Sequence, residues 1–179
     1  MPETRRRRNG RAGQTIQTER GTLRLRPEEG GAAEEAFLYL LFSAIKAPEM
    51  ALMPISTQHK EHLLQIQYRS MNATYRHHYP DARFEIVELD RWPVGRLVTA
   101  VQEHCVYYVD IALLPQASGL GLGTALMTSV LAEPRRLGLP ARVKVLSHNI
   151  PSLRLMRRVG FTPFGSTPPY VDLEWRPGG

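Results

Sequence analysis

Hydrophobic and polar positions alternate in residues 22–26, where Leu23 and Leu25 stand between polar side chains, and this period of two predicts a β-strand. Residues 32–46 repeat their apolar positions at helical spacing and are rich in alanine, glutamate and leucine, which predicts a helix. We expect this helix to end before Pro48, because proline lacks the backbone N–H that a helix interior uses. The chain therefore opens with a strand followed by a helix.

A second helix is predicted from a cap at Ser56 or Thr57 to about His78, with Pro80 ending it. Its apolar and aromatic stripe consists of Leu64, Tyr68, Met71 and Tyr75. The period then changes back to two, which predicts three successive strands at 84–89, 94–101 and 105–114. The first two of these strands read as a hairpin, because the turn-forming segment 90–93 joins them.

Helical spacing returns at Leu122, and we expect Gly138 to end this helix and Pro134 to kink or shorten it. Alternation at residues 141–147 predicts another strand. Asn149 and Pro151 are typical of a helix N-cap and first turn, and Gly160 supplies a C-terminal stop. Two closing strands are predicted at 161–164 and 170–175.

The predicted order is strand, two helices, three strands, helix, strand, helix and two strands. This order indicates an α/β fold in which helices cover a mixed sheet of about seven strands. A chain of 179 residues with 42% hydrophobic content is long enough for one domain with a substantial core, and we place that domain at residues 22–176.

The formal charge of +6 lies mostly in the first 20 residues, where six arginines and two glutamates give +4. A segment so rich in arginine and so poor in apolar residues cannot bury a core, so we expect residues 1–20 to form a disordered tail. Such a tail can contact a nucleic acid or an anionic membrane, but a solvated terminus is the favoured interpretation. The nearly neutral remainder does not predict a nucleic-acid-binding domain.

The chain contains no apolar run of the roughly 18 to 20 residues that a membrane-spanning helix needs, and it begins with charge instead of an apolar signal core. We therefore expect a cytoplasmic protein without a membrane segment. Cys105 is the single cysteine, which excludes an internal disulfide, and we expect a buried thiol. His59 and His62 lie three residues apart without a third ligand in view, so no metal site is predicted.

Gly119, Gly121 and Gly123 lie between a predicted strand and a predicted helix. Unpaired backbone N–H groups and the positive end of a helix can bind an anion at such a place, and glycine lets the anion approach closely. A P-loop would need Gly-Lys-Ser or Gly-Lys-Thr, and a dinucleotide fingerprint would need a further glycine at Thr124 or Leu126. The segment is therefore a candidate phosphate-binding loop of another kind.

The segment 149–161, "NIPSLRLMRRVGF", follows the next predicted strand. Together with the glycine loop it resembles the GNAT superfamily of acyl-CoA N-acetyltransferases, in an uncharacterised bacterial branch. The family's pyrophosphate motif, Arg/Gln-x-x-Gly-x-Gly/Ala, maps best onto Ser118, Gly121 and Gly123, with Gln116, Gly119 and Gly121 as a second register. The resemblance covers about residues 22–175. It implies a mostly antiparallel sheet with four helices on its two faces and with strands splayed around the CoA arm.

The resemblance implies acetyl-CoA as a co-substrate and no metal. The strand that contains Ile111, Ala112 and Leu113 would pair with the pantetheine arm, and residues 118–124 would hold the pyrophosphate. Further cofactor contacts would come from Asn149, Ser152 and Met156. The complete predicted set is Ile111, Ala112, Leu113, Ser118, Gly119, Leu120, Gly121, Leu122, Gly123, Thr124, Asn149, Ser152 and Met156. Ser118 and Leu120 replace frequent basic residues, for which Arg157 or Arg158 can compensate electrostatically.

The implied reaction is direct attack of a neutral amine on the acetyl thioester, which needs a base, an oxyanion donor and an acid. We choose Asp110 as the base, because it shares a strand face with Ala112 opposite Ile111 and Leu113; a carboxylate that only pairs within the sheet is an equal alternative, and Glu85 is the reserve. The oxyanion donor would be a backbone N–H near Leu113.

The family often has a tyrosine where this chain has Met156, and a thioether cannot donate a proton. The general acid would then be Tyr170 or a water held by Ser152. We expect the acceptor pocket between the 50–54 loop, the second helix and the segment 168–170. Five aromatic or imidazole side chains, namely Tyr68, Tyr75, His77, His78 and Tyr79, either line this pocket or belong to the core.

Two function hypotheses follow. The first is an acetyl-CoA-dependent N-acetyltransferase that acts on the primary amine of a small molecule or of a protein. The second is a non-catalytic acyl-CoA-binding module with the same fold, which the departures at Ser118 and Met156 favour. Domains of this kind often form homodimers, and the resemblance extends that expectation to this chain.

Overall fold

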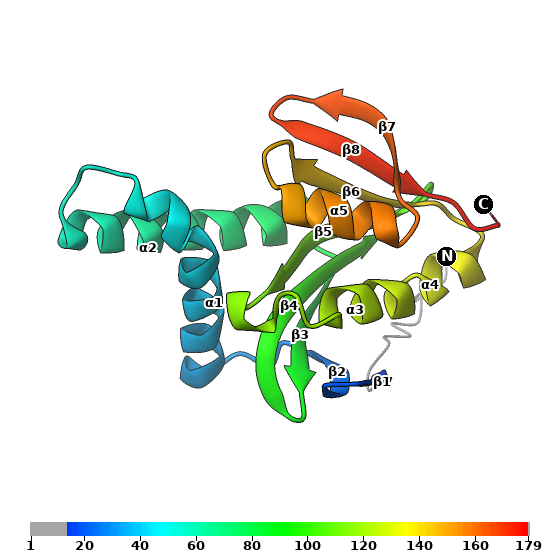
Figure 1. Cartoon of the computed structure of the whole chain (residues 1–179), viewed down its shortest axis with the longest axis horizontal. Helices are drawn as coiled ribbons and strands as arrows, with labels where there is room; N and C mark the ends of the chain where they lie inside the picture. The colour runs from blue at the N-terminus through cyan, green and yellow to red at the C-terminus, as the bar shows by residue number, and fades with distance from the viewer. Residues whose placement is uncertain (1–13, 179) are drawn as a thin grey trace, which may run out of the picture.

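Eight strands form one open sheet within residues 14–178, the part of the chain that the computed structural model describes (Figure 1). The strand order is β1-β2-β3-β4-β5-β6-β8-β7, and every neighbouring pair is antiparallel except β5 and β6, which are parallel. The strands are β1 (Thr15–Thr18), β2 (Gly21–Pro27), β3 (Arg83–Leu89), β4 (Trp92–Val101), β5 (Val106–Leu113), β6 (Ala141–Leu146), β7 (Thr162–Thr167) and β8 (Tyr170–Trp175). The mixed, mostly antiparallel sheet confirms the predicted fold class, with one strand more than expected.

Helices cover both faces of this sheet, with α3 and α5 on the near side in Figure 1. The helices are α1 (Ala32–Ala51), α2 (Thr57–His78), α3 (Leu122–Val130), α4 (Ala132–Leu137) and α5 (Ile150–Arg158), with a short 3₁₀ turn, η1 (Pro115–Ala117). The larger core lies between the sheet and the helices α3 and α5, where Leu126 and Met127 are fully buried. A smaller core of Leu38, Tyr68 and Ile86 lies between the sheet and the helices α1 and α2.

The helix α1 continues through Pro48 to Ala51, so the prediction that it ends before Pro48 is wrong. Proline within a helix removes one backbone hydrogen bond, but burial of a later side chain can compensate for this loss. Met50 supplies that burial, because only 4% of its surface is exposed. The predicted 50–54 loop therefore begins only after Ala51.

The helix predicted from Leu122 to Gly138 is interrupted at Leu131, which separates α3 from α4. Pro134 has no N–H to donate to the carbonyl group of Val130 four residues earlier. The Tyr108 hydroxyl of β5 donates to this carbonyl oxygen instead, at 3.1 Å. The prediction that Pro134 shortens the helix is confirmed. The free carbonyl group of Val130 accepts the hydrogen bond that holds Tyr108 in the core.

The strand β1 lies in a stretch that composition alone assigned to a disordered tail. It pairs with β2, and Ile16 packs against the larger core. One apolar residue between threonine and glutamine was too weak a signal to predict a strand. Residues 1–13, which contain most of the arginines of the predicted tail, lie outside the described residues.

Candidate active site

The strands β5 and β6 pair over only three residues and then separate. The paired positions are Val106 with Ala141, Tyr107 with Arg142, and Tyr108 with Val143. β5 continues to pair with β4, and β6 with β8, beyond this point, so the two halves of the sheet diverge (Figure 1). The β6-facing backbone edge of residues 109–113 is therefore not used by a neighbouring strand.

The glycine loop begins where β5 ends and leads through η1 into α3. Gly119 and Gly121 both have φ near +77°, in the left-handed region that favours glycine. A Cβ atom built on either residue would meet no atom within 4 Å, so the space beside both is open. These two residues form an open cradle in which backbone groups can approach a ligand.

The first turn of α3 faces this cradle without a side-chain cap. The first backbone hydrogen bond of the helix runs from the N–H of Ala125 to the carbonyl oxygen of Gly121, at 3.0 Å. The preceding N–H groups of Leu122, Gly123 and Thr124 have no earlier helical turn to bond to, so they can donate to an anion. The first turn of α3 is therefore open to an anionic group.

Gly123 has a different role from the other two glycines. A Cβ atom at this position would lie 3.1 Å from Cδ2 of Leu155 and 3.7 Å from Cδ1 of Leu113. The missing side chain therefore lets α3 pack closely against α5 and the end of β5. The missing side chain of Gly123 thus serves packing, whereas its backbone N–H group stays available in the first turn of α3.

A basic side chain lies beside the first turn of α3. Arg158, at the C-terminal end of α5, places Nη1 3.5 Å from the Thr124 hydroxyl oxygen. Ser118, the position where the family motif has a basic residue or glutamine, ends the η1 turn through its backbone N–H. Arg158 is therefore placed to supply the positive charge that Ser118 does not.

The N-terminus of α5 follows the predicted capping pattern. The Asn149 side chain accepts a hydrogen bond from the backbone N–H of Ser152 at 3.2 Å. Met156 is 2% exposed and belongs to the larger core. The roles of Asn149, Ser152 and Met156 toward a cofactor stay predictions.

A β-bulge in β5 decides which way Asp110 points. Tyr108 pairs with Thr99 and Asp110 pairs with Val98, so Val109 is an extra residue in the strand. Tyr108 reaches Val130 of α3 on one face, whereas Asp110 lies near Arg96 on the other face. Ile111 and Leu113 pack against the larger core, which places Asp110 opposite these two residues as the sequence predicts.

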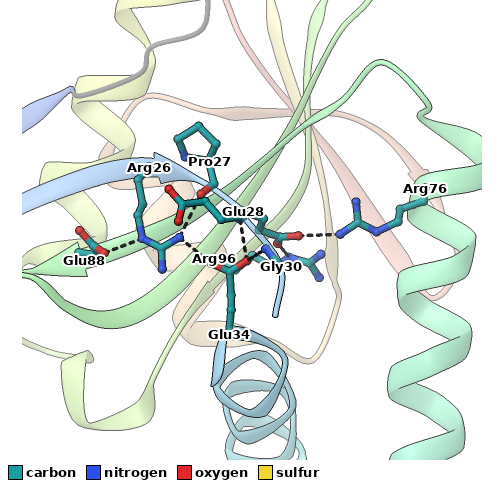
Figure 2. A network of polar contacts seen from close by, with 9 residues as sticks. Arg26, Pro27, Glu28, Gly30, Glu34, Arg76, Glu88 and Arg96 are labelled. Carbon is teal, nitrogen blue, oxygen red and sulfur yellow. Dashed lines mark hydrogen bonds and ion pairs between the residues drawn. The ribbon is translucent and has the colours of Figure 1, made fainter. Parts of the chain in front are cut away.

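The Asp110 carboxylate lies near Arg96, which belongs to the polar network that Figure 2 shows. Its Oδ2 atom is 3.9 Å from Nη1 of Arg96, and its side chain is 20% exposed. Burial raises the pKa of Asp110 above its usual range, Arg96 opposes the rise, and the negative charge of Glu28 adds to it. A carboxyl group with a raised pKa suits a base that works near neutral pH.

A tyrosine on α2 interacts with this carboxylate, and further tyrosines lie near that tyrosine. Burial raises the pKa of Tyr75 on α2, and the charges of Asp110 and Tyr170 raise it further. Tyr79 stacks on Tyr107 with 5.7 Å between ring centroids, and burial raises the pKa of Tyr107. Tyr170 begins β8 and is 40% exposed. Sequence reasoning missed Tyr107, for which the only signal was its position three residues before Asp110.

Other predicted acceptor residues lie elsewhere. Tyr68 is 4% exposed in the smaller core, and His77 and His78 are exposed and contact each other edge to face. Glu85, the reserve base, lies between Arg83, which pairs with Glu133 of α4, and the core residue Val87. By strand alternation it therefore faces the opposite side of the sheet from Asp110.

A hollow of about 190 Å³ opens on the sheet beside Tyr107, toward β7. It is smaller than the 300 Å³ or more that is typical of a ligand pocket. Its lining residues are Gln102, Cys105, Tyr107, Arg142, Val143, Lys144, Phe164 and Asp172. Cys105 is 4% exposed there, which confirms the predicted buried thiol. The hollow shares only Tyr107 with the surroundings of Asp110.

His59 and His62 lie on α2, where the ring of His59 is 3.0 Å from the Ser56 hydroxyl that caps the helix. Across residues 14–178, no group of three or more histidine, cysteine, aspartate or glutamate side chains is arranged to hold a metal ion. Over the same residues, no helix has both the length and the apolar content that crossing a bilayer requires.

The sequence model of the acetyltransferase (GNAT) family matches residues 50–161, which include Asp110, the glycine loop and all of α5. The chain therefore belongs to the GNAT acetyltransferase family. This membership makes the protein an acyltransferase that depends on acetyl-CoA as its co-substrate. No curated protein is similar enough in sequence to match.

Solved structures share the fold at low sequence identity. The PaiA N-acetyltransferase of Thermoplasma acidophilum, in complex with coenzyme A, has a TM-score of 0.63 and 14% identity over 86% of this chain and 98% of its own. Mycobacterium smegmatis RimJ, in complex with CoA-disulfide, has a TM-score of 0.62 and 17% identity over 92% and 86%. RimL, a ribosomal L7/L12 alpha-N-protein acetyltransferase, has a TM-score of 0.57 and 17% identity over 90% and 95%.

Proposed function

We propose that acetyl-CoA binds in the opening between β5 and β6 and that Asp110 promotes transfer of its acetyl group to an amine. The observation that carries this proposal is the separation of β5 from β6 immediately beside the uncapped first turn of α3. An extended chain with amide groups can add to the open edge of β5 as a strand adds to a sheet. Pantetheine is such a chain, and its diphosphate end would reach the N–H groups of residues 119–124.

The reacting amine would attack the carbonyl carbon of the thioester directly. A C–N bond forms, the C–S bond breaks, and the bonding electrons of the C–S bond leave with sulfur. Asp110 would accept a proton from the amine, directly or through a water. A backbone N–H near Leu113 would stabilise the negative charge that develops on the carbonyl oxygen.

The leaving thiolate needs a proton, for which we propose Tyr170. The buried Met156 thioether has no proton to give, whereas a phenol has. Tyr75 interacts electrostatically with Asp110, but its raised pKa makes its hydroxyl group a weak acid. Tyr75 is therefore better suited to donate a fixed hydrogen bond than to supply a proton. Tyr170 is 40% exposed and pairs with Leu146 at the end of β6, the strand that borders the opening opposite β5.

The acceptor is a primary amine of a small molecule or of a protein. Support for a protein amine comes from RimL, whose name describes an alpha-N-protein acetyltransferase, and Campylobacter jejuni PseH is a further N-acetyltransferase with the same fold. Both kinds of acceptor therefore belong in the test. A homodimer and a cytoplasmic location in a bacterium complete the proposal.

Two measurements test this function. Calorimetry should show binding of CoA and of acetyl-CoA, and thiol release should follow when a panel of amines and N-terminal peptides is added. The Gly121→Asp variant serves as the non-binding control. Binding without thiol release on any acceptor would support the alternative, a non-catalytic acyl-CoA-binding module, and absence of binding would contradict both.

A further inference from the structure

Arg96 on β4 is buried to an unusual degree for an arginine, with 2% of its surface exposed. Its Nε donates to Oε1 of Glu28 at 2.7 Å, and its Nη1 donates to Oδ1 of Asn72 on α2 at 2.7 Å. Burying a guanidinium is costly unless its charge and its donors are satisfied, so such an arrangement calls for a reason.

The third neighbour of this guanidinium is the Asp110 carboxylate. The distance of 3.9 Å between Nη1 and Oδ2 is too long for a hydrogen bond but short enough for a strong electrostatic contact. Among residues 14–178, the buried Nη2 atom of Arg96 has no hydrogen-bond partner. One donor therefore stays available for the carboxylate or for a water that joins the two groups.

The charged and titratable groups that face Asp110 come from several elements. Arg96 comes from β4, Glu28 from the segment after β2, and Tyr75 from α2. Arg76 of α2 binds the second oxygen of Glu28 at 2.7 Å, so Glu28 is held between two arginines (Figure 2). The carboxylate of Asp110 thus faces one fixed positive charge and one fixed negative charge.

We propose that Arg96 is a positioning residue for the acetyl transfer, fixed by Glu28 and Asn72 so that its guanidinium sets the orientation and the protonation of Asp110. This inference rests on the proposed function, because it assigns a helper to the base of that reaction. It also makes α2 part of the catalytic arrangement, since Asn72 and Tyr75 lie on the same helix, one turn apart.

The structure provides a matched control in the same network. Arg26 on β2 donates from Nε to Glu88 at 2.6 Å and from Nη1 to Glu34 at 2.5 Å (Figure 2), whereas the charges that act on Asp110 are those of Arg96 and Glu28. Glu28 and Glu88 are thus both shielded carboxylates bound by an arginine Nε. Of these two carboxylates, Glu28 acts on the charge of Asp110. A comparison of Glu28→Gln with Glu88→Gln therefore separates an effect on Asp110 from a general effect on the stability of the fold.

The decisive readout is the titration of the Asp110 side-chain carbonyl carbon by NMR in the full-length protein, which needs no substrate. Glu28→Gln removes a negative charge near Asp110 and frees Arg96 to approach it, so the midpoint should move to lower pH. Glu88→Gln should leave the midpoint unchanged. Equal effects of the two variants, or no effect of either, would overturn the proposal.

Kinetics supply the second readout. Arg96→Lys keeps the charge but cannot reach Glu28, Asn72 and Asp110 together, so kcat should fall about 10- to 100-fold while KM for acetyl-CoA stays the same. The milder Asn72→Ala should lower kcat in the same direction without loss of folding, and Glu28→Gln should move the acidic limb of kcat/KM to lower pH. An unchanged kcat in a folded Asn72→Ala variant, together with an unchanged acidic limb of kcat/KM in Glu28→Gln, would count against the positioning role of Arg96.

If the wild-type protein acetylates no amine, the proposed function fails, and the NMR titration still decides whether Arg96 and Glu28 control the protonation of Asp110.

Discussion

Arg158 and Thr124 join the end of α5 to the first turn of α3, with 3.5 Å between the guanidinium Nη1 and the threonine hydroxyl oxygen. This contact brings a positive charge to the helix end whose N–H groups are open. The helix dipole and the guanidinium therefore act in the same direction on an anion at this place.

We expect Arg158→Gln to weaken CoA binding about tenfold, because one charge-assisted hydrogen bond contributes about 1.5 kcal/mol. The loss should shrink as salt concentration rises, since the side chain is exposed. Calorimetric titration at low and high salt measures both effects. Arg136→Gln, which removes an exposed guanidinium from α4, is the control, and an equal loss in both variants would contradict a local role for Arg158.

Gly121→Asp should abolish most CoA affinity, by more than about tenfold, because a carboxylate in the cradle repels the diphosphate. Gly138→Asp is a matched control, since Gly138 also has a left-handed φ, of 67°, and open space at its Cβ position. Both variants should lose similar stability from backbone strain, about 1 kcal/mol. CoA titration and thermal unfolding separate the two effects, and unchanged affinity in Gly121→Asp would refute the cradle.

Asp110→Asn should lower kcat/KM about 10²- to 10⁴-fold, the usual contribution of a general base. In the wild-type protein, kcat/KM should fall as pH drops through the raised pKa of Asp110, because the protonated carboxyl group cannot accept a proton. A pH profile of thiol release measures this limb. If the variant keeps full activity and the limb, the base is another group.

The same substitution should change stability in the opposite direction. Burial raises the pKa of Asp110 in the folded state above its unfolded value of about 3.9, so this group favours folding below that pH and loses the contribution as pH rises through the folded pKa. Asp110→Asn should therefore raise Tm at pH 7, by about 2 to 4 °C for each kcal/mol gained, and the difference should vanish near pH 3. Thermal unfolding across pH tests this, and a lower Tm at pH 7 would contradict it.

Tyr170→Phe should lower kcat about 10²-fold or more and leave the affinity for CoA unchanged, if its hydroxyl group protonates the departing thiolate. Tyr75→Phe is the informative comparison, because it removes a hydroxyl group from the same surroundings that we expect to orient, not to protonate. Its effect should be smaller. Equal kcat losses, or a loss only in Tyr75→Phe, would reassign the acid.

Most elements were predictable, because strong periodicity marks them in the sequence. The N-cap at Ser56, the cap at Asn149 and the break near Pro134 depend on local chemistry that single residues reveal. The true end of α1 was not predictable, because the sequence does not show that Met50, which follows Pro48, is buried. The strand β1 was likewise not predictable, because Ile16 is stabilised by the larger core that it contacts and not by a local sequence pattern.

The candidate site was predictable in part. The glycine loop and Asp110 follow from their order in the sequence, whereas the groups that interact with Asp110 come from three segments far apart in the chain, represented by Glu28, Tyr75 and Arg96. No sequence pattern links Glu28 and Asn72 with Arg96, so the buried network needed the structure. The packing role of Gly123 was equally hidden, since it depends on Leu155 some thirty residues later.

The single extra residue at Val109 changes the parity of β5. In a regular strand Tyr108 and Asp110, which lie two positions apart, would point to the same face. The bulge sends them to opposite faces, with Tyr108 in the larger core and Asp110 near Arg96. Deletion of Val109 should keep Tyr108 and Asp110 on opposite faces, because the two residues would then be neighbours in a regular strand. The bulge at Val109 therefore lets one strand contribute Tyr108 to the larger core and Asp110 to the candidate site.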